Sequence, residues 1–185
     1  MEVKGTAVMT TRDFVKAKFP DRYNAWMDSL PPATKNLLSG SIMTAGWYPL
    51  KDGYTVPIDK IRMMFYAGDA KACGDALGKY SADIVLHGIY KAFLMIASPK
   101  FLMQRASSIM SNYYKPSEIK TVENNPKNVT LLVTQFEGIT ETLEYRFGGW
   151  VVRALELANC KNVHYTITKA LSHHQDKTEI VFSWD

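Results

Sequence analysis

The sequence has few cysteines, no long apolar run and no signal-peptide pattern, and each absence excludes a class of protein. Two cysteines in 185 residues are too few for a disulfide framework and fit a reducing compartment. The first residues lack the basic-then-apolar pattern of a signal peptide, so we expect a cytoplasmic protein. The most apolar stretch, 84–97, is shorter than a spanning helix and carries His87 and Lys91, which predicts a core helix and no transmembrane segment.

A dense block of basic residues is also missing. The 22 basic and 18 acidic residues give a net charge of +4 and are spread along the chain. Nucleic-acid binding requires a concentrated basic patch, so we predict no nucleic-acid partner.

The sequence contains no recognisable catalytic motif. There is no phosphate-binding glycine loop, zinc-protease helix or dinucleotide fingerprint, and Ser107-Ser108 lacks the glycine-flanked elbow of a nucleophile. Glu141 and Glu144 could form an acid–base pair, but carboxylates at a helix start more often stabilise the helix dipole. We predict that the protein is not an enzyme.

Metal-binding residues are scarce as well. His173 and His174 are adjacent, so their side chains point in different directions, and with Asp176 they fall in a predicted hairpin turn. We predict no metal site and no cofactor.

What the sequence does have is an apolar content of 46%, which allows 185 residues to bury roughly 70% of their unfolded surface in one core. No linker, repeat or low-complexity segment divides the chain. We predict a single domain over residues 1–185, in which residues 1–40 form a collar of one strand and short helices.

The second half predicts a small antiparallel sheet crossed by one helix. Residues 129–134 form a β-branched run, and apolar side chains alternate in 163–168 and 180–184. Between the first two strands, apolar positions recur at helical spacing, with Thr140 as N-cap and Asn159 as stop.

The first half predicts mainly helices, and Gly74 and Gly78 weaken the pattern of one of them by about 1 kcal/mol each relative to alanine. The predicted segments are a strand over 3–9, helices over 11–19, 21–30, 32–38, 55–65, 69–81, 82–96 and 98–113, an irregular segment over 41–53, and a strand over 117–123. The predicted fold class is α/β (α+β), with a helical first half packed on a small antiparallel sheet and one helix crossing it.

The order of these elements, with Asn112-Tyr113-Tyr114, the run Tyr145 to Trp150 and the final Phe182-Ser183-Trp184, resembles one ligand-binding superfamily. It comprises four-vinyl-reductase-type sensor domains, haem nitric-oxide-binding domains and TRAPP vesicle-tethering subunits. Within it, the chain is most similar to an uncharacterised, mainly myxobacterial family. The resemblance covers residues 40–185 and implies an α/β fold, often dimeric, that holds a small molecule or acyl chain in an apolar pocket.

The chain departs from the better-known relatives at their functional residues. Haem-binding members carry a proximal histidine and a Tyr-x-Ser-x-Arg motif, whereas 114–117 reads Tyr-Lys-Pro-Ser and His87 is predicted on a polar helix face. The zinc site of phenol-sensing members needs four ligands, but Cys160 is the one cysteine in the carboxy-terminal region. Cys73 compares with the acylated cysteine of some tethering subunits, although a buried free thiol is the commoner outcome.

Adaptable and aromatic side chains on three predicted helices indicate an apolar pocket, because methionine conforms to varied ligands. Arg105 and Tyr113 would be the polar groups that orient the ligand. The predicted ligand-binding residues are Met64, Phe65, Tyr90, Phe93, Phe101, Leu102, Arg105, Ile109, Tyr113 and Trp150. A packed core rich in methionine is the competing interpretation.

These observations predict a non-enzymatic sensor domain that binds a small apolar or amphipathic molecule and signals through a homodimer or a partner protein. The first alternative is a protein–protein interaction module with a filled core, which docks through Trp47, Tyr48 and the amino-terminal helices. The second is a haem- or tetrapyrrole-binding accessory protein.

Overall fold

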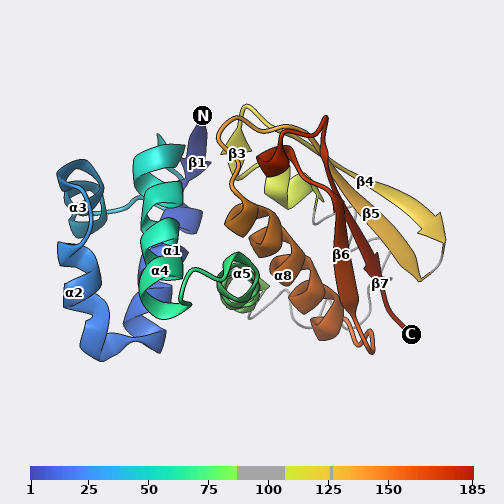
Figure 1. Cartoon of the computed structure of the whole chain (residues 1–185), viewed down its shortest axis with the longest axis horizontal. Helices are drawn as coiled ribbons and strands as arrows, with labels where there is room; N and C mark the ends of the chain where they lie inside the picture. Colours follow the sequence, from blue (N-terminus) through green and yellow to red (C-terminus); the bar gives the residue numbers. More distant parts are fainter. Residues whose placement is uncertain (87–106, 126) are drawn as a thin grey trace.

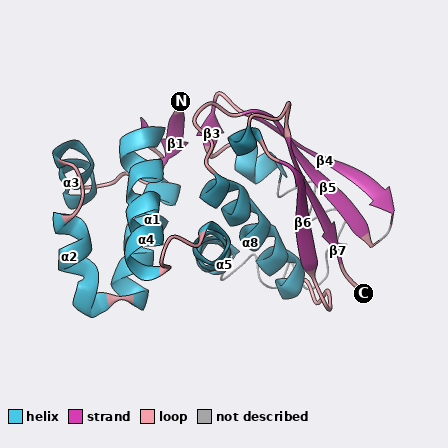
Figure 2. Cartoon of the chain, viewed as in Figure 1, coloured by secondary structure: helices cyan, strands magenta, loops and turns pink. Residues whose placement is uncertain are grey.

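A computed structural model describes residues 1–86, 107–125 and 127–185 of the chain. Figure 2 separates its helices from its strands. The helices are α1 (Gly5–Lys18), α2 (Tyr23–Asp28), α3 (Pro32–Ser39), α4 (Val56–Phe65), α5 (Ala70–Leu86) and α8 (Glu141–Leu157). Shorter turns are the 3-10 helices η1 (Pro20–Arg22) and η3 (Leu171–His173), the π-helix η2 (Lys51–Thr55) and a helical turn over 107–111. The strands are β1 (Glu2–Lys4), β2 (Trp47–Pro49), β3 (Tyr114–Lys115), β4 (Glu118–Asn125), β5 (Asn128–Gln135), β6 (His164–Lys169) and β7 (Thr178–Ser183).

Helix α8 lies between the helices of the first half and a four-stranded sheet (Figure 1). One side of α8 packs along α5, and the other side contacts β6 and β7. The sheet has the antiparallel order β4-β5-β7-β6, and Leu131 of β5 stands opposite Ile180 of β7, both fully buried. A second, small sheet of order β2-β1-β3 ties the amino terminus to Tyr114. The α/β class is therefore confirmed, with α8 as the crossing helix.

The predictions for the second half agree with the structure. The β-branched run over 129–134 lies in β5, and the two alternating segments form β6 and β7. Thr140 is the N-cap of α8, since its side-chain oxygen accepts a hydrogen bond from the Leu143 amide at 3.4 Å. Asn159 follows the end of α8 with a left-handed φ of 66°, which terminates the helix.

Several predictions for the first half are wrong at their boundaries. The strand predicted over 3–9 ends at Lys4, because α1 begins at Gly5. Thr55 stands at the N-cap position of α4 as predicted, but its side chain forms no capping hydrogen bond. Its backbone is helical and its hydroxyl donates to the Lys51 carbonyl at 3.3 Å, because η2 runs directly into α4. In the segment predicted as irregular, Trp47–Pro49 forms β2 by pairing with β1.

The predicted boundary between helices over 69–81 and 82–96 is wrong, because α5 continues as one helix from Ala70 to Leu86. The rest of the helix predicted over 82–96, and most of the helix predicted over 98–113, lie outside the described residues.

The contact between α5 and α8 depends on glycines. A Cβ atom at Gly78 would lie 2.3 Å from the Arg146 carbonyl oxygen, and one at Gly149 would lie 2.7 Å from the Asp75 Cα. The two helices therefore approach more closely than larger residues would permit. This close approach sets Ser81 of α5 beside Arg146 of α8.

Across the described ranges, we find no helix that combines the length and the apolar character needed to span a bilayer.

Candidate functional site

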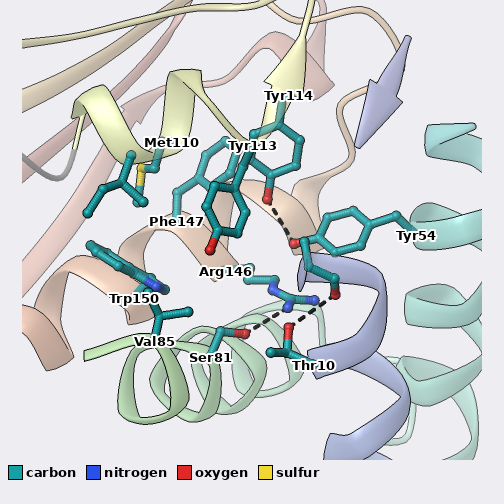
Figure 3. Close-up of a pocket in the computed structure, with 12 residues that line it drawn as sticks. Thr10, Tyr54, Ser81, Val85, Met110, Tyr113, Tyr114, Arg146, Phe147 and Trp150 are labelled. Carbon is teal, nitrogen blue, oxygen red and sulfur yellow. Dashed lines mark hydrogen bonds between the residues drawn. The ribbon is translucent and has the colours of Figure 1, made fainter. Parts of the chain in front are cut away.

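A cavity of about 40 Å³ lies where α1, α5 and α8 meet the segment that leads into β3 (Figure 3). Its wall is mainly apolar, with a few hydroxyl groups and one guanidinium. The residues that line it are Ala7, Thr10, Tyr54, Ser81, Val85, Ile109, Met110, Tyr113, Tyr114, Arg146, Phe147 and Trp150.

Arg146 is the charged group of the cavity, and it is 3% exposed. Its Nη1 donates to Thr11 Oγ1 at 2.9 Å and its Nη2 donates to Ser81 Oγ at 2.7 Å. The guanidinium carbon also lies 4.6 Å from the centre of the Tyr54 ring, a cation–π distance. Within the described part of the chain, Arg146 forms no ion pair with a carboxylate.

The two hydroxyl partners of Arg146 use their own hydrogens elsewhere. Thr11 Oγ1 donates to the Ala7 carbonyl, and Ser81 Oγ donates to the Leu77 carbonyl, each at 2.8 Å. Their oxygens are therefore acceptors toward the guanidinium, and both are neutral. The positive charge of Arg146 is solvated by dipoles rather than balanced by an anion.

A pair of buried phenols lies next to the guanidinium. The hydroxyl groups of Tyr54 and Tyr114 are 2.8 Å apart and share a hydrogen bond. Burial raises the pKa of Tyr54 and raises the pKa of Tyr114 well above its ordinary value, although Arg146 acts against both shifts. Both phenols are neutral at physiological pH, so they add hydrogen-bonding capacity without charge.

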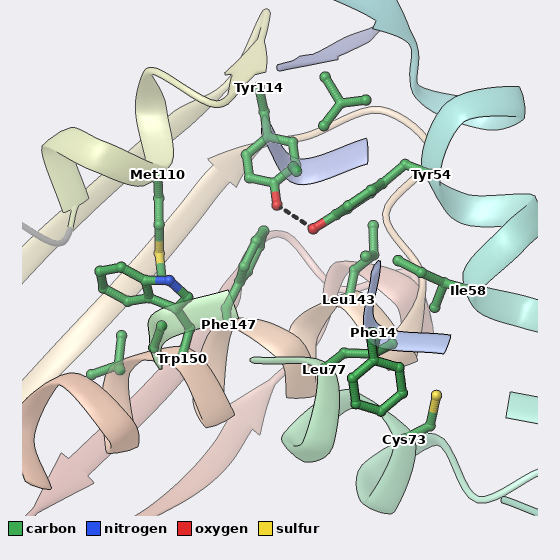
Figure 4. Packing of buried hydrophobic residues seen from close by; sticks show 14 of the residues in the cluster. Phe14, Tyr54, Ile58, Cys73, Leu77, Met110, Tyr114, Leu143, Phe147 and Trp150 are labelled. Atoms are coloured by element: carbon green, nitrogen blue, oxygen red, sulfur yellow. Dashed lines mark hydrogen bonds between the residues drawn. The ribbon is translucent and has the colours of Figure 1, made fainter. Parts of the chain in front are cut away.

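Aromatic rings close the cavity on the side of the sheet. Tyr114, Phe136 and Phe147 form a cluster whose ring centres are 5.0 to 5.8 Å apart. Figure 4 shows Met110 and Trp150 beside this cluster. The apolar end of the cavity therefore has a rigid aromatic side and a flexible methionine side.

No protein-family model matches the sequence, and neither does any curated protein. Solved structures do match. An H-NOX protein from S. oneidensis in the Fe(II)NO ligation state superposes with a TM-score of 0.73 at 11% identity, covering 98% of this chain and 99% of that chain. The Fe(II) unliganded H-NOX protein from K. algicida superposes with a TM-score of 0.70 at 9% identity, covering 98% of this chain and 96% of that chain. A third structure, whose description concerns the modulation of haem redox potential by protein-induced porphyrin distortion, superposes with a TM-score of 0.67 at 10% identity. This match covers 98% of this chain and 95% of that chain.

The chain has the H-NOX fold. At these identities the likeness establishes the fold alone. The resemblance to the four-vinyl-reductase, TRAPP and myxobacterial branches stays a prediction.

The H-NOX fold brings some of the predicted ligand-binding residues together. Ile109, Tyr113 and Trp150 line the cavity. Met64 and Phe65 do not, because this part of α4 faces the amino-terminal helices: Phe65 stacks on Phe19 with ring centres 4.1 Å apart, and Met64 accepts a hydrogen bond from Ser29. The others, Tyr90, Phe93, Phe101, Leu102 and Arg105, lie outside the described residues. Ligand binding by any of these residues stays a prediction.

Sequence reasoning missed Arg146, Tyr54 and Tyr114. A signal for Arg146 was present, because it stands three residues after Leu143 and one before Phe147 on the apolar face of a predicted helix. A charged residue at such a position is buried on folding and needs partners. Tyr54 carried no such signal, since it lies between the segment predicted as irregular, 41–53, and the helix predicted over 55–65.

None of the described cysteines and histidines considered from the sequence lines the cavity. Cys73 is a fully buried free thiol, and its burial raises its pKa to about 12. His173 and His174 are exposed, and His87 lies outside the described residues. Over the described ranges, no cluster of three or more His, Cys, Asp or Glu side chains has metal-binding geometry.

The aromatic residues assigned to a docking surface are partly covered. Trp47 is half-buried, with the amines of Lys4 and Lys115 at 4.4 and 4.1 Å from its ring centre. Tyr48 is half-buried too, and its hydroxyl accepts a hydrogen bond from the Met43 amide. Among the described residues, the large hydrophobic side chains that stand exposed include no aromatic ring; they are Met43, Met63, Ile84 and Val122.

Proposed function

We propose that the protein is a non-catalytic sensor domain that binds a small amphipathic molecule in the cavity between α1, α5 and α8. The cavity carries this proposal, because it combines an apolar wall with a few converging polar groups, as small-molecule sites do. The H-NOX fold supports it, since the similar structures of that fold include one with NO on Fe(II).

The position of the cavity suits a sensor. Its wall includes Thr10 of α1, Ser81 of α5 and Trp150 of α8, so an occupant contacts the helices of the first half and the helix that packs on the sheet. A ligand that fits one relative position of these helices better than another shifts the population toward it. We propose that a homodimer or a separate partner protein reads this shift.

Haem is a second candidate ligand. The descriptions of two similar structures name an Fe(II) state, and the description of a third names the haem redox potential. The described lining residues do not fit it. They include no histidine or cysteine, and Tyr54 and Tyr114 hold their protons through burial, so neither supplies a phenolate to iron. Among the described lining residues, this leaves Tyr113 and Met110 as the side chains of an axial-ligand type. A volume of about 40 Å³ is also well below the roughly 300 Å³ at which pockets for larger organic ligands begin.

Native mass spectrometry of the purified protein, repeated after denaturation, tests the proposal. We expect an extra mass in the native state that is lost on denaturation. The variant Val85→Phe, which adds a ring at the cavity wall, should lose that mass. The control Val122→Phe, at an exposed position of β4, should keep it. An extra mass that survives in Val85→Phe would contradict the assignment to this cavity.

An absorbance spectrum of the same sample separates the two candidate ligands. A visible band that disappears on acid extraction would establish a haem or other tetrapyrrole. A bound mass without a visible band would support the amphipathic ligand. A bare chain mass that is unchanged after incubation with small amphipathic compounds would favour the interaction module.

A further inference from the structure

We propose that the ligand is a small organic monocarboxylate, whose carboxylate pairs with Arg146 and whose apolar part lies against Ile109, Met110 and Trp150. This inference rests on the proposed function and adds the chemical class of the ligand. It follows from the charge, the hydrogen bonds and the size of the cavity.

Among the described residues, Arg146 is a buried arginine that lacks an ionic partner, unlike the ion-paired arginines. Arg22 forms no ion pair there either, but it is exposed to solvent. Arg12, Arg62 and Arg153 are at least partly exposed, and each forms an ion pair with an aspartate. Arg146 is the most buried of these arginines, and no carboxylate within the described ranges pairs with it. An ion removed from water without a counterion costs several kcal/mol even after the protein relaxes. An anionic ligand would supply the missing counterion.

The hydrogen bonds of Arg146 leave room for that ligand. A guanidinium has five N–H groups, and the two bonds to Thr11 and Ser81 leave 5 − 2 = 3 without a protein acceptor in the described part of the chain. The planar fork of these groups matches the two oxygens of a carboxylate. Figure 3 shows the guanidinium between Ser81, Tyr54 and Tyr113, at the polar end of the cavity.

The nearest buried carboxylate on α8 does not fill this role. Glu144 lies two residues before Arg146 and accepts hydrogen bonds from Ser172 and Thr178, next to the sheet. Its oxygens are therefore engaged on the side of α8 away from α5. The described residues therefore supply no buried carboxylate to Arg146, and an anionic ligand would take that place.

The remaining wall determines the rest of the ligand. Beyond the polar end, the cavity is lined by Val85, Ile109, Met110, Phe147 and Trp150, which favour an apolar group. The volume of about 40 Å³ holds only a few water-sized groups, at roughly 10–15 Å³ each. A short-chain acid such as propionate satisfies both limits.

Isothermal titration calorimetry with propionate and with propionamide, its neutral isostere, tests the assignment. On the full chain we expect propionate to bind at least tenfold more tightly than propionamide. The variant Arg146→Met should lose this preference. Arg153→Met, a matched substitution on the same helix at an arginine that pairs with Asp83 and Glu156, should keep it.

The stability of the ligand-free variants guards against a merely structural role for Arg146. Methionine leaves no donor of Thr11 or Ser81 unsatisfied, because both hydroxyls already donate to backbone carbonyls. We therefore expect ligand-free Arg146→Met to melt at or above the wild-type temperature. If it does not fold, Arg146→Lys keeps the charge without the fork and should weaken propionate binding several-fold while retaining the preference over propionamide.

Three results would overturn the inference. Equal binding of propionate and propionamide would show that the site does not recognise the carboxylate, although the cavity would still be a ligand site. If Arg146→Met and Arg153→Met lose the preference for propionate over propionamide to the same extent, the positive charge acts through the overall electrostatic field of the protein and not through a contact with the ligand. No binding of either compound, with an extra native mass still present, would exclude the short-chain acid but not the proposed function.

Discussion

Glu144 and Arg146 are two residues apart on α8 and are both buried, yet they lie on opposite sides of the helix and do not pair. Two residues of an α-helix turn the chain by about 200°, which separates the two side chains. Glu144 faces the tip of the β6–β7 hairpin and Arg146 faces α1 and α5. Each charge is held by hydroxyl groups, so the helix presents one buried anion to the sheet and one buried cation to the cavity.

The first prediction concerns the structural member of this pair. Glu144 accepts hydrogen bonds from the Ser172 amide, the Ser172 hydroxyl and the Thr178 hydroxyl. Glu144→Gln keeps the shape of the side chain but replaces one acceptor oxygen with an NH2 group, which faces the Ser172 and Thr178 donors. We therefore expect the free energy of unfolding to fall by about 2 kcal/mol. Urea denaturation measures it. Glu141→Gln, an exposed residue in the same first turn, should change it by less than about 1 kcal/mol, and equal losses would contradict the role given to Glu144.

The second prediction concerns the hydrogen bond between Tyr54 and Tyr114. Tyr114→Phe leaves the Tyr54 hydroxyl buried without its partner, which should cost about 1–3 kcal/mol of unfolding free energy. The double variant Tyr54→Phe/Tyr114→Phe removes both polar groups and should cost less than the sum of the single variants. A double-mutant cycle by chemical denaturation measures the coupling. Additive losses would show that the hydrogen bond contributes no stability.

The sequence was most informative where local patterns decide the structure. The β-branched run of β5, the alternation in β6 and β7 and the cap at Thr140 all depend on near neighbours, and the structure agrees with them. The start of α1 was missed because it depends on a distant contact. The preceding strand β1 ends at Lys4, where its pairing with β2 ends, and α1 begins at the next residue, Gly5.

The cavity depends on contacts between distant residues. Arg146 meets Thr11, which is 135 residues away in sequence, and Tyr54 meets Tyr114 across 60 residues. Periodicity identifies an apolar face but not which faces meet, so the site could be predicted only as a set of mainly apolar and aromatic residues on several helices, with Arg105 and Tyr113 as the polar groups. Phe65 is an example: it lies on the predicted apolar face of its helix, but it packs against Phe19 and does not line the cavity.

The third prediction follows from the glycines of α5. Sequence alone suggested that Gly78 weakens this helix, whereas in the structure a Cβ there would lie 2.3 Å from the Arg146 carbonyl oxygen. Gly78→Ala should therefore lower the free energy of unfolding by about 1–3 kcal/mol despite the better helix propensity of alanine. Gly40→Ala is the control, because its added methyl meets atoms no nearer than 3.5 Å and should change stability by less than about 0.5 kcal/mol. Thermal denaturation followed by circular dichroism compares the two. A stabilised Gly78→Ala would contradict the close helix contact.

The fourth prediction concerns the stability of the protein at high pH. Burial raises the pKa of the Cys73 thiol from 9.0 to about 12, so the folded state holds this proton more tightly than the unfolded state. The thiol's contribution to stability is therefore complete below pH 9.0 and is lost as the pH rises toward about 12. Burial raises the pKa of Tyr66 to about 12 as well, so the whole protein weakens in this range and a comparison of variants is needed to isolate the thiol.

Cys73→Ala isolates that contribution because it removes the titrating group. In urea denaturation below pH 9.0 the variant should be less stable than wild type, since it loses buried volume, and the difference should shrink or reverse toward pH 12. Cys160→Ala provides the control, because that thiol is only half-buried and its pKa is raised less. A wild-type advantage over Cys73→Ala that stays constant with pH would mean that the thiol ionises equally in the folded and unfolded chains, and hence that water reaches the Cys73 side chain in the folded protein.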